Sequence, residues 1–252
     1  YFPVEKNTAV HATRPAPSLP AEIPTPAIRF FYAIIHKHAK KEYKCLIYYL
    51  NEKGNTMGRL EGKVAIVTGS TSGIGIGIAK VYAAEGATVV ISGRRAEKGQ
   101  VVVDQIVEAG GKASFHYFDI TEPASIEALI ADTVEQYGKL DILVNNAGIT
   151  RDGLLMRMSE EDFDAVLNTN LKGCFNTIRH MSRYFLKQKS GKIINISSVW
   201  GNVGASMEVA YSASKGGVNS FTKALAKELA PSHIQVNAIA CGVIDTEMNA
   251  CF

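Results

Sequence analysis

From Met57 onward, the chain alternates short apolar segments with longer segments of helical periodicity, and no other feature restricts its fold as much. The short segments are apolar and mostly β-branched, which is typical of strands buried on both faces. They are Val64–Thr68, Thr88–Ser92, Ala113–Phe118, Ile142–Asn145, Lys192–Ile196 and Gln235–Ile239. This alternation predicts βαβ units and an α/β fold, a doubly wound parallel sheet in a three-layer α/β/α arrangement. Right-handed crossovers then bring the carboxyl ends of the strands, and any ligand crevice, to one edge.

One of the longer segments shows helical spacing clearly. Its apolar positions are Phe163, Val166, Leu167, Leu171 and Phe175. Ser159 precedes them, and Asp162 follows it by three residues, which approximates a capping box. We therefore expect a helix to begin at Ser159.

Residues 1–56 differ in composition from the rest of the chain. Six of the eight prolines lie there, which excludes a continuous helix or a central strand. The apolar run 27–35 is too short to span a bilayer and lacks the charge order of a secretory signal. We expect 1–56 to be a poorly ordered or non-native extension and 57–252 to be the nucleotide-binding domain. Two alternatives are a membrane-surface role for residues 27–35 and a true start at Met57.

Composition and charge place the protein among soluble globular proteins. The 252 residues are 46% hydrophobic and 20% charged, and the net charge of +3 is too small to indicate nucleic acid as the main partner. The four cysteines have neither metal-ligand nor redox-pair spacing. They are Cys45, Cys174, Cys241 and Cys251. We expect reduced thiols in a cytoplasmic protein, no metal and no membrane contact.

A glycine-rich turn directly follows the first predicted strand, in the run Thr68–Gly75. Gly69 permits a tight turn, Gly73 lets the backbone approach a pyrophosphate, and Gly75 allows a helix to pack closely on a strand. Glycines alone would suit any tight turn. Their position between a strand and a helix favours a dinucleotide site and a Rossmann fold.

The end of the second predicted strand indicates which dinucleotide binds. An enzyme that uses NAD usually places a carboxylate there, to accept a hydrogen bond from the ribose 2′-hydroxyl. Gly93 occupies that position, and Arg94 and Arg95 follow it. Arg94 can pair with a 2′-phosphate, so the sequence favours NADP(H). The alternative is a solvated basic start to the next helix.

Tyr211 and Lys215 lie four residues apart at the start of a helical stretch, so both project from one face. A nearby ammonium would lower the pKa of the phenol toward a range useful for proton transfer. Ser198 follows the predicted strand Lys192–Ile196 and can donate a hydrogen bond to a substrate carbonyl. Taken alone, a Tyr-x-x-x-Lys spacing is a common accident on helical surfaces.

Together these motifs resemble the short-chain dehydrogenase/reductase family, from Gly58 to Phe252. The resemblance implies catalytic roles for Asn170, Ser198, Tyr211 and Lys215. Tyr211 would donate the proton, Lys215 would also bind the nicotinamide ribose, and Asn170 would hold a water that links Lys215 to solvent. The resemblance implies cofactor contacts for Gly69, Ser70, Ser72, Gly73, Ile74, Gly75, Arg94, Asp119, Ile120, Asn146, Ala147, Gly148, Tyr211, Lys215, Ile244 and Thr246.

Within that family, the run 146–158 resembles reductases of 3-oxoacyl groups on acyl carrier protein, in fatty-acid synthesis. We therefore expect reduction of a 3-oxoacyl thioester with NADPH. Lys189 stands where a basic contact to the carrier protein is expected, but Ser232 replaces a second one. Trp200 and Glu208 instead resemble reductases of 5-aminopentanone-modified elongation factor P, so that substrate or another small ketone is the alternative.

Family members continue past the segment 245–248 with a substrate-covering helical part and a last strand that helps to build a tetramer. This sequence ends at Phe252. We expect a C-terminally truncated chain, with a homotetramer for the complete enzyme. An alternative of a different class is a non-catalytic fragment that only binds nucleotide. Cys241 replaces a proline of the family, and a neutral filler is the favoured interpretation.

Overall fold

The computed structural model describes residues 58–249. The predicted extension 1–56, the start at Met57, and the cysteines Cys45 and Cys251 lie outside the described residues. Between residues 58 and 249, no helix has both the length and the apolar composition that a membrane span needs.

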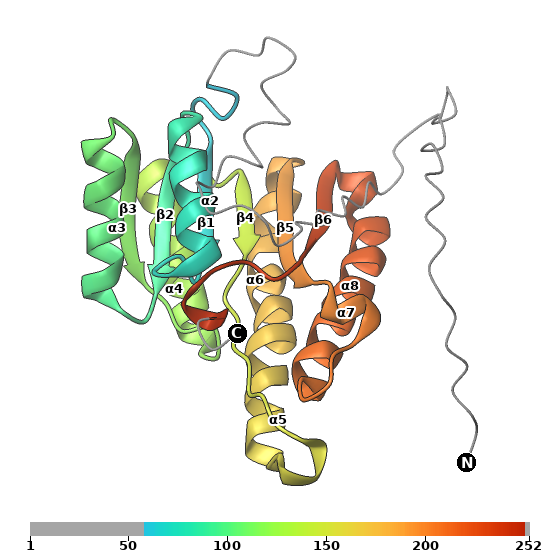
Figure 1. Ribbon diagram of the computed structural model, residues 1–252. Coiled ribbons are helices and arrows are strands. Elements are labelled where there is room, and N and C mark those ends of the chain that lie inside the picture. Colours follow the sequence, from blue (N-terminus) through green and yellow to red (C-terminus); the bar gives the residue numbers. More distant parts are fainter. Residues whose placement is uncertain (1–57, 250–252) are drawn as a thin grey trace, which may run out of the picture.

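Six parallel strands form one sheet in the order β3-β2-β1-β4-β5-β6 (Figure 1). Their bounds are β1 Val64–Thr68, β2 Thr88–Gly93, β3 Lys112–Tyr117, β4 Ile142–Asn145, β5 Gly191–Ser198 and β6 Ile234–Cys241. All six predicted strands are present, and the first and fourth have the predicted bounds. The doubly wound parallel sheet is confirmed.

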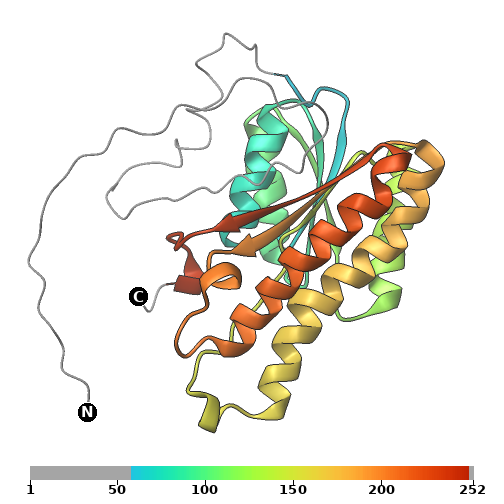
Figure 2. The same cartoon turned by 90° about the vertical axis from the view of Figure 1, so that its right-hand side faces the viewer.

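The helices cover both faces of this sheet. They are α2 Gly73–Ala84, α3 Ala96–Glu108, α4 Pro123–Tyr137, α5 Glu160–Leu167, α6 Gly173–Gln188, α7 Trp200–Val203 and α8 Val209–Leu229. Short turns of other helical types are η1 Leu155–Arg157, η2 Asn168–Lys172, η3 Ala230–Ser232 and η4 Glu247–Asn249. Seen along the sheet, α2 and α3 lie on one side, with α6 and α8 on the other (Figure 2).

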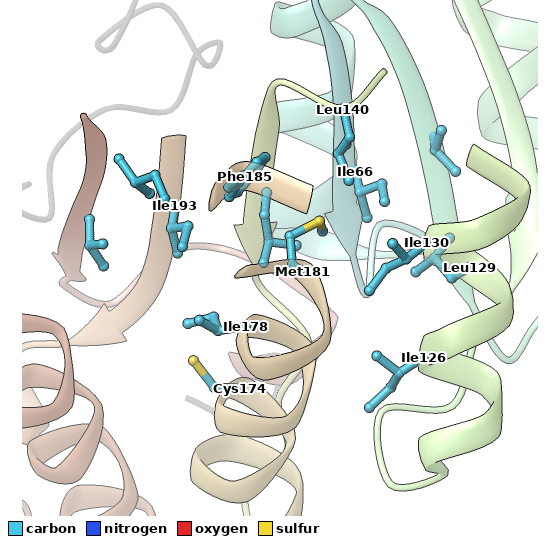
Figure 3. Close-up of a cluster of buried hydrophobic side chains, with 14 of the residues drawn as sticks. Ile66, Ile126, Leu129, Ile130, Leu140, Cys174, Ile178, Met181, Phe185 and Ile193 are labelled. Atoms are coloured by element: carbon cyan, nitrogen blue, oxygen red, sulfur yellow. The ribbon is translucent and has the colours of Figure 1, made fainter. Parts of the chain in front are cut away.

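The period of two in each strand divides the core between these two layers. Ile66 of β1 packs in a cluster with Leu129 of α4 and Met181 of α6 (Figure 3). Its neighbour Val67 packs on the opposite face, in a cluster with Ala79 of α2. Successive side chains of a strand point to opposite faces, so strands buried on both faces need the continuous apolar runs seen in the sequence.

The helix expected at Ser159 begins there. The backbone N–H of Asp162 donates to the Ser159 Oγ at 3.1 Å, which caps α5. The helix does not stay regular, however, because the π-helical turn η2 follows α5 before α6 continues in the same direction. In a π-helical turn each backbone hydrogen bond spans five residues instead of four, and such turns occur frequently at functional sites.

Candidate active site

A cavity of about 640 Å³ lies along the carboxyl ends of the strands, and segments that follow β1, β2, β4 and β6 contribute to its wall. The strand order reverses between β1 and β4, because the chain moves outward to β3 and then returns to the other side of β1. Doubly wound sheets bind ligands at such a reversal. The cavity is therefore in the position that the sequence predicts for a ligand crevice.

The glycine-rich turn between β1 and α2 is packed too closely for larger residues. Gly69 has a φ of +64°, and a Cβ atom there would lie 2.8 Å from the Cα of Ala147. A Cβ atom at Gly75 would lie 2.6 Å from the Gly69 carbonyl oxygen. Asn146 Nδ2 donates to the carbonyl oxygens of Thr68, at 3.0 Å, and Gly69, at 3.1 Å. The segment after β4 thus braces the turn.

The side chain of Ser70 points away from the cavity that the other predicted cofactor residues line. It is completely buried, and its Oγ donates to the Val67 carbonyl at 2.6 Å and accepts from the Ser92 N–H at 2.9 Å. Ser70 therefore joins β1 to β2 and does not line the cavity. Gly75 is also absent from the cavity wall and acts through the packing of the turn.

Two guanidiniums line the end of the cavity near β2. Arg94 Nη1 lies 3.9 Å from Asp119 Oδ2, and Arg95 Nη2 donates to Thr71 Oγ1 at 3.4 Å. Burial raises the pKa of Asp119, but hydrogen bonds from Thr121 and the charge of Arg94 lower that pKa by more. Asp119 is therefore ionised at neutral pH. This end of the cavity carries the cations that the sequence predicts for a 2′-phosphate.

Tyr211, Lys215 and Ser198 line the cavity together. Tyr211 and Lys215 come from the first two turns of α8, and Ser198 ends β5. Lys215 Nζ donates to the Ile196 carbonyl at 2.7 Å and lies 5.6 Å from the centre of the Tyr211 ring. The structure thus brings together the three groups that the sequence predicts for proton transfer.

The pKa of Tyr211 shifts in the direction opposite to the predicted one. Burial raises it to about 12, although a hydrogen bond with Ser198 acts to lower it, and the charge of Glu208 raises it further. Burial also lowers the pKa of Lys215 to about 8. The charged form of each group loses hydration in the cavity wall, so the phenol keeps its proton at neutral pH.

Asn170 lies in η2, behind the cavity wall rather than in it. Its Nδ2 donates to the Ile149 carbonyl at 2.9 Å and to Ser214 Oγ at 3.0 Å, and its Oδ1 accepts from the Ile149 N–H at 2.8 Å. A Cβ atom at Gly148 would lie 3.1 Å from Asn170 Oδ1 and 3.6 Å from Lys215 Nζ. Asn170 therefore holds the segment after β4 against α8, close to Lys215.

Most of the predicted residues meet in this one cavity. Those that line it are Gly69, Ser72, Gly73, Ile74, Arg94, Asp119, Ile120, Asn146, Ala147, Gly148, Ser198, Tyr211, Lys215, Ile244 and Thr246. The three that do not are Ser70, Gly75 and Asn170. Cys241 also lines the cavity, and burial raises the pKa of its thiol, which suits the neutral filler predicted for it.

Two carboxylates, those of Asp152 and Glu208, line the cavity near Tyr211. The sequence points to Glu208 but not to Asp152. The Gly153 N–H donates to the Met207 carbonyl at 2.8 Å, so the segment after β4 meets the one before α8. Burial raises the pKa of Glu208, and the charge of Asp152 raises it further. No local pattern pairs residues that lie 56 positions apart.

A doubly wound sheet with a glycine turn at its order reversal defines the class of dinucleotide-binding proteins. Comparison with known proteins then gives the family. The family model described as short chain dehydrogenase matches residues 63–251, so the chain belongs to the short-chain dehydrogenase family.

Individual relatives agree with this assignment. The 3-oxoacyl-[acyl-carrier-protein] reductase FabG of Chlamydia pneumoniae is 43% identical over 191 residues, which cover 76% of this chain and 77% of that protein. FabG of Thermotoga maritima is 46% identical over 190 residues, which cover 75% and 77%. A solved structure of a variant actinorhodin polyketide ketoreductase with NADPH has a TM-score of 0.73 and 40% identity, and covers 75% of this chain and 73% of that one.

The protein is therefore an oxidoreductase that acts on carbonyl or alcohol groups, with a nicotinamide nucleotide as cofactor. The cavity suits such a cofactor in this structure. The turn at Gly69 leaves no room for a side chain, and the cations at Arg94 and Arg95 lie at the opposite end from Tyr211 and Lys215. In the described part of the chain, no group of three or more potential metal ligands is present.

Proposed function

We propose that this chain is an NADPH-dependent reductase that converts a 3-oxoacyl thioester on acyl carrier protein into the 3-hydroxyacyl form. The observation that carries the proposal is the meeting of Ser198, Tyr211 and Lys215 at one end of a cavity whose other end is cationic. The names of the relatives from Chlamydia and Thermotoga support the substrate class.

The cationic end supports the choice of NADPH over NADH. Gly93 carries no carboxylate that could accept from a ribose 2′-hydroxyl, and Arg94 and Arg95 face the cavity beside it. A guanidinium is suited to a phosphate because its donors can form two parallel hydrogen bonds. The polyketide ketoreductase of similar fold was crystallised with NADPH.

The proton comes from Tyr211 in this proposal. Reduced nicotinamide, when bound, supplies the hydride that reaches the carbonyl carbon. Ser198 donates a hydrogen bond to the carbonyl oxygen, where negative charge develops, and Tyr211 delivers its phenolic proton to that same oxygen. A pKa of about 12 keeps the phenol protonated before the reaction, so the proton is available.

Lys215 and Asn170 act around this tyrosine. The Lys215 ammonium is held by the Ile196 carbonyl, from where it stabilises the phenolate that Tyr211 becomes. Asn170 fixes the backbone at Ile149. We propose that Lys215 then returns a proton to the Tyr211 phenolate, and that Asn170 also holds the water that reprotonates Lys215 from solvent.

A second candidate substrate follows from the carboxylates of Asp152 and Glu208. Both line the cavity, and the charge of each raises the pKa of Tyr211. A ketone that carries a cationic group near its carbonyl would therefore be attracted there. A 5-aminopentanone group on a protein has this chemistry. A thioester has no charge next to its carbonyl and would gain nothing from these residues.

One assay separates these substrates. NADPH oxidation is measured with acetoacetyl thioester on acyl carrier protein and with an amino ketone, beside a direct titration of NADPH binding. Faster turnover of the thioester supports the first candidate, and faster turnover of the amino ketone supports the second. NADPH binding without turnover of either ketone would instead identify a non-catalytic nucleotide-binding protein.

A further inference from the structure

The last described segment places a carboxylate on the cations of the cofactor cavity. This segment follows β6 and crosses the carboxyl edge of the sheet toward β2 (Figure 1). Glu247 Oε2 lies 4.0 Å from Arg95 Nη1, and Glu247 Oε1 lies 3.7 Å from Lys98 Nζ. Each carboxylate oxygen thus faces a different cation, and both cations belong to the start of α3.

This carboxylate marks a position suited to an anion. Arg95 and Glu247 both line the cavity, and so does Thr71, whose hydroxyl accepts from Arg95. Arg94 is turned instead toward Asp119. Each guanidinium thus already faces one carboxylate, and that of Glu247 is the one shared between Arg95 and Lys98.

We propose that Glu247 occupies the anion position that the 2′-phosphate of NADPH takes, so that Glu247 competes with NADPH and not with NADH. The inference rests on the proposed use of NADPH. A carboxylate and a phosphate cannot share Arg95 and Lys98 without strong repulsion, so Glu247 must leave when the phosphate arrives. NADH has no 2′-phosphate and leaves the two ion pairs intact.

The consequence is a defined selectivity. NADPH must break the two ion pairs of Glu247 in order to bind, and this lowers its affinity. The loss is small because the Glu247 side chain is 69% exposed. Removing its charge should therefore tighten NADPH binding by about threefold to tenfold. NADH binding should change by less than about twofold.

The test is a fluorescence titration of the full chain with NADPH and with NADH, in the absence of any ketone. Glu247→Gln is compared with Glu108→Gln, which removes the same charge from the far end of α3. The inference expects tighter NADPH binding in Glu247→Gln alone. In that background, Lys98→Ala should then weaken NADPH binding and leave NADH binding unchanged.

The outcomes separate this inference from the proposed cofactor. A wild-type preference for NADPH that Glu247→Gln leaves unchanged overturns the role of Glu247 and keeps the cofactor. Equal binding of both nucleotides to the wild type, with a preference that emerges in Glu247→Gln, supports the role of Glu247. Equal binding in both proteins contradicts the inference and the use of NADPH together. An equal gain in NADPH affinity in Glu108→Gln would show that the effect comes from net charge alone, and it would also overturn the inference.

Discussion

Two glycines of the same helix should respond in opposite ways to alanine. In Gly75→Ala, the new methyl would lie 2.6 Å from the Gly69 carbonyl oxygen and 2.7 Å from Asn146 Nδ2. These atoms belong to the turn and its brace, so relief requires the turn to shift. In Gly77→Ala, no atom beyond the adjacent residues and the helix's own nearby backbone lies within 4 Å of the new methyl, and the residue lies inside α2.

The magnitudes follow from this packing. Overpacking of this kind costs about 1 to 3 kcal/mol of unfolding free energy, whereas glycine to alanine in a helix with open space gains about 0.5 to 1 kcal/mol. The two variants should thus differ by at least about 1.5 kcal/mol. At a urea slope of about 2 kcal/mol per molar, their unfolding midpoints should differ by at least roughly 0.75 M.

Urea unfolding and NADPH titration of both variants check this reasoning. Gly75→Ala should also lose cofactor affinity by more than about tenfold, because the distorted turn no longer fits a pyrophosphate. Gly77→Ala should bind NADPH as the wild type does. Equal midpoints, or wild-type affinity in Gly75→Ala, would refute the claim that close packing at this turn builds the site.

Three further predictions concern single side chains. Arg94→Ala should reduce the NADPH-over-NADH preference in binding titrations by about tenfold, the value of a charge-assisted hydrogen bond. Ser70→Ala should cost about 1 to 3 kcal/mol in urea unfolding, because it leaves the buried Ser92 N–H without its side-chain acceptor, and unchanged stability would contradict the structural role of Ser70. The pKa of Lys215 is near 8 in the folded chain and 10.5 in the unfolded one, so the unfolded state binds more protons between these values. Wild-type stability should therefore rise from pH 8 to pH 10.5 relative to Lys215→Met, by on the order of 3 kcal/mol, and parallel pH profiles would contradict the burial of the ammonium.

The strands could be predicted because they are buried on both faces. Val64–Thr68 and Ile142–Asn145 lie at the centre of the sheet, where apolar character begins and ends with the strand. The carboxyl ends of β5 and β6 extend two residues beyond the predicted segments, and in β5 those two residues are serines. Ser198 pairs with Cys241 there, because backbone hydrogen bonding continues regardless of the side chain. Hydrophobic pattern alone does not report that continuation.

Parts of the site could not be predicted, because they depend on which way a side chain turns. Ser70 and Thr71 are neighbours of similar chemistry, yet Ser70 points between two strands and Thr71 into the cavity. Asn170 lies in a π-helical turn, although the apolar spacing around it fits a regular α-helix. Its role came from resemblance, and nothing in the periodicity marks the turn.

The pKa of Tyr211 shows a similar limit. The sequence places Lys215 one helical turn away, and that neighbour alone predicts a lowered pKa. Burial raises this pKa most, and the charges of Asp152 and Cys241, which lie 89 positions apart in the sequence, raise it further. Both effects depend on which segments the fold brings against the phenol, and no local spacing reports that.

Single-turnover kinetics of Tyr211→Phe test the central claim most directly, that Tyr211 supplies the proton to the reduced carbonyl. The change removes one hydroxyl and keeps the ring that packs beside Lys215, so folding and NADPH binding should persist. With a 3-oxoacyl thioester or an amino ketone as substrate, the rate of NADPH oxidation should fall by at least about a hundredfold. A Tyr211→Phe protein that binds NADPH and reduces the ketone at nearly the wild-type rate would show that another group supplies the proton.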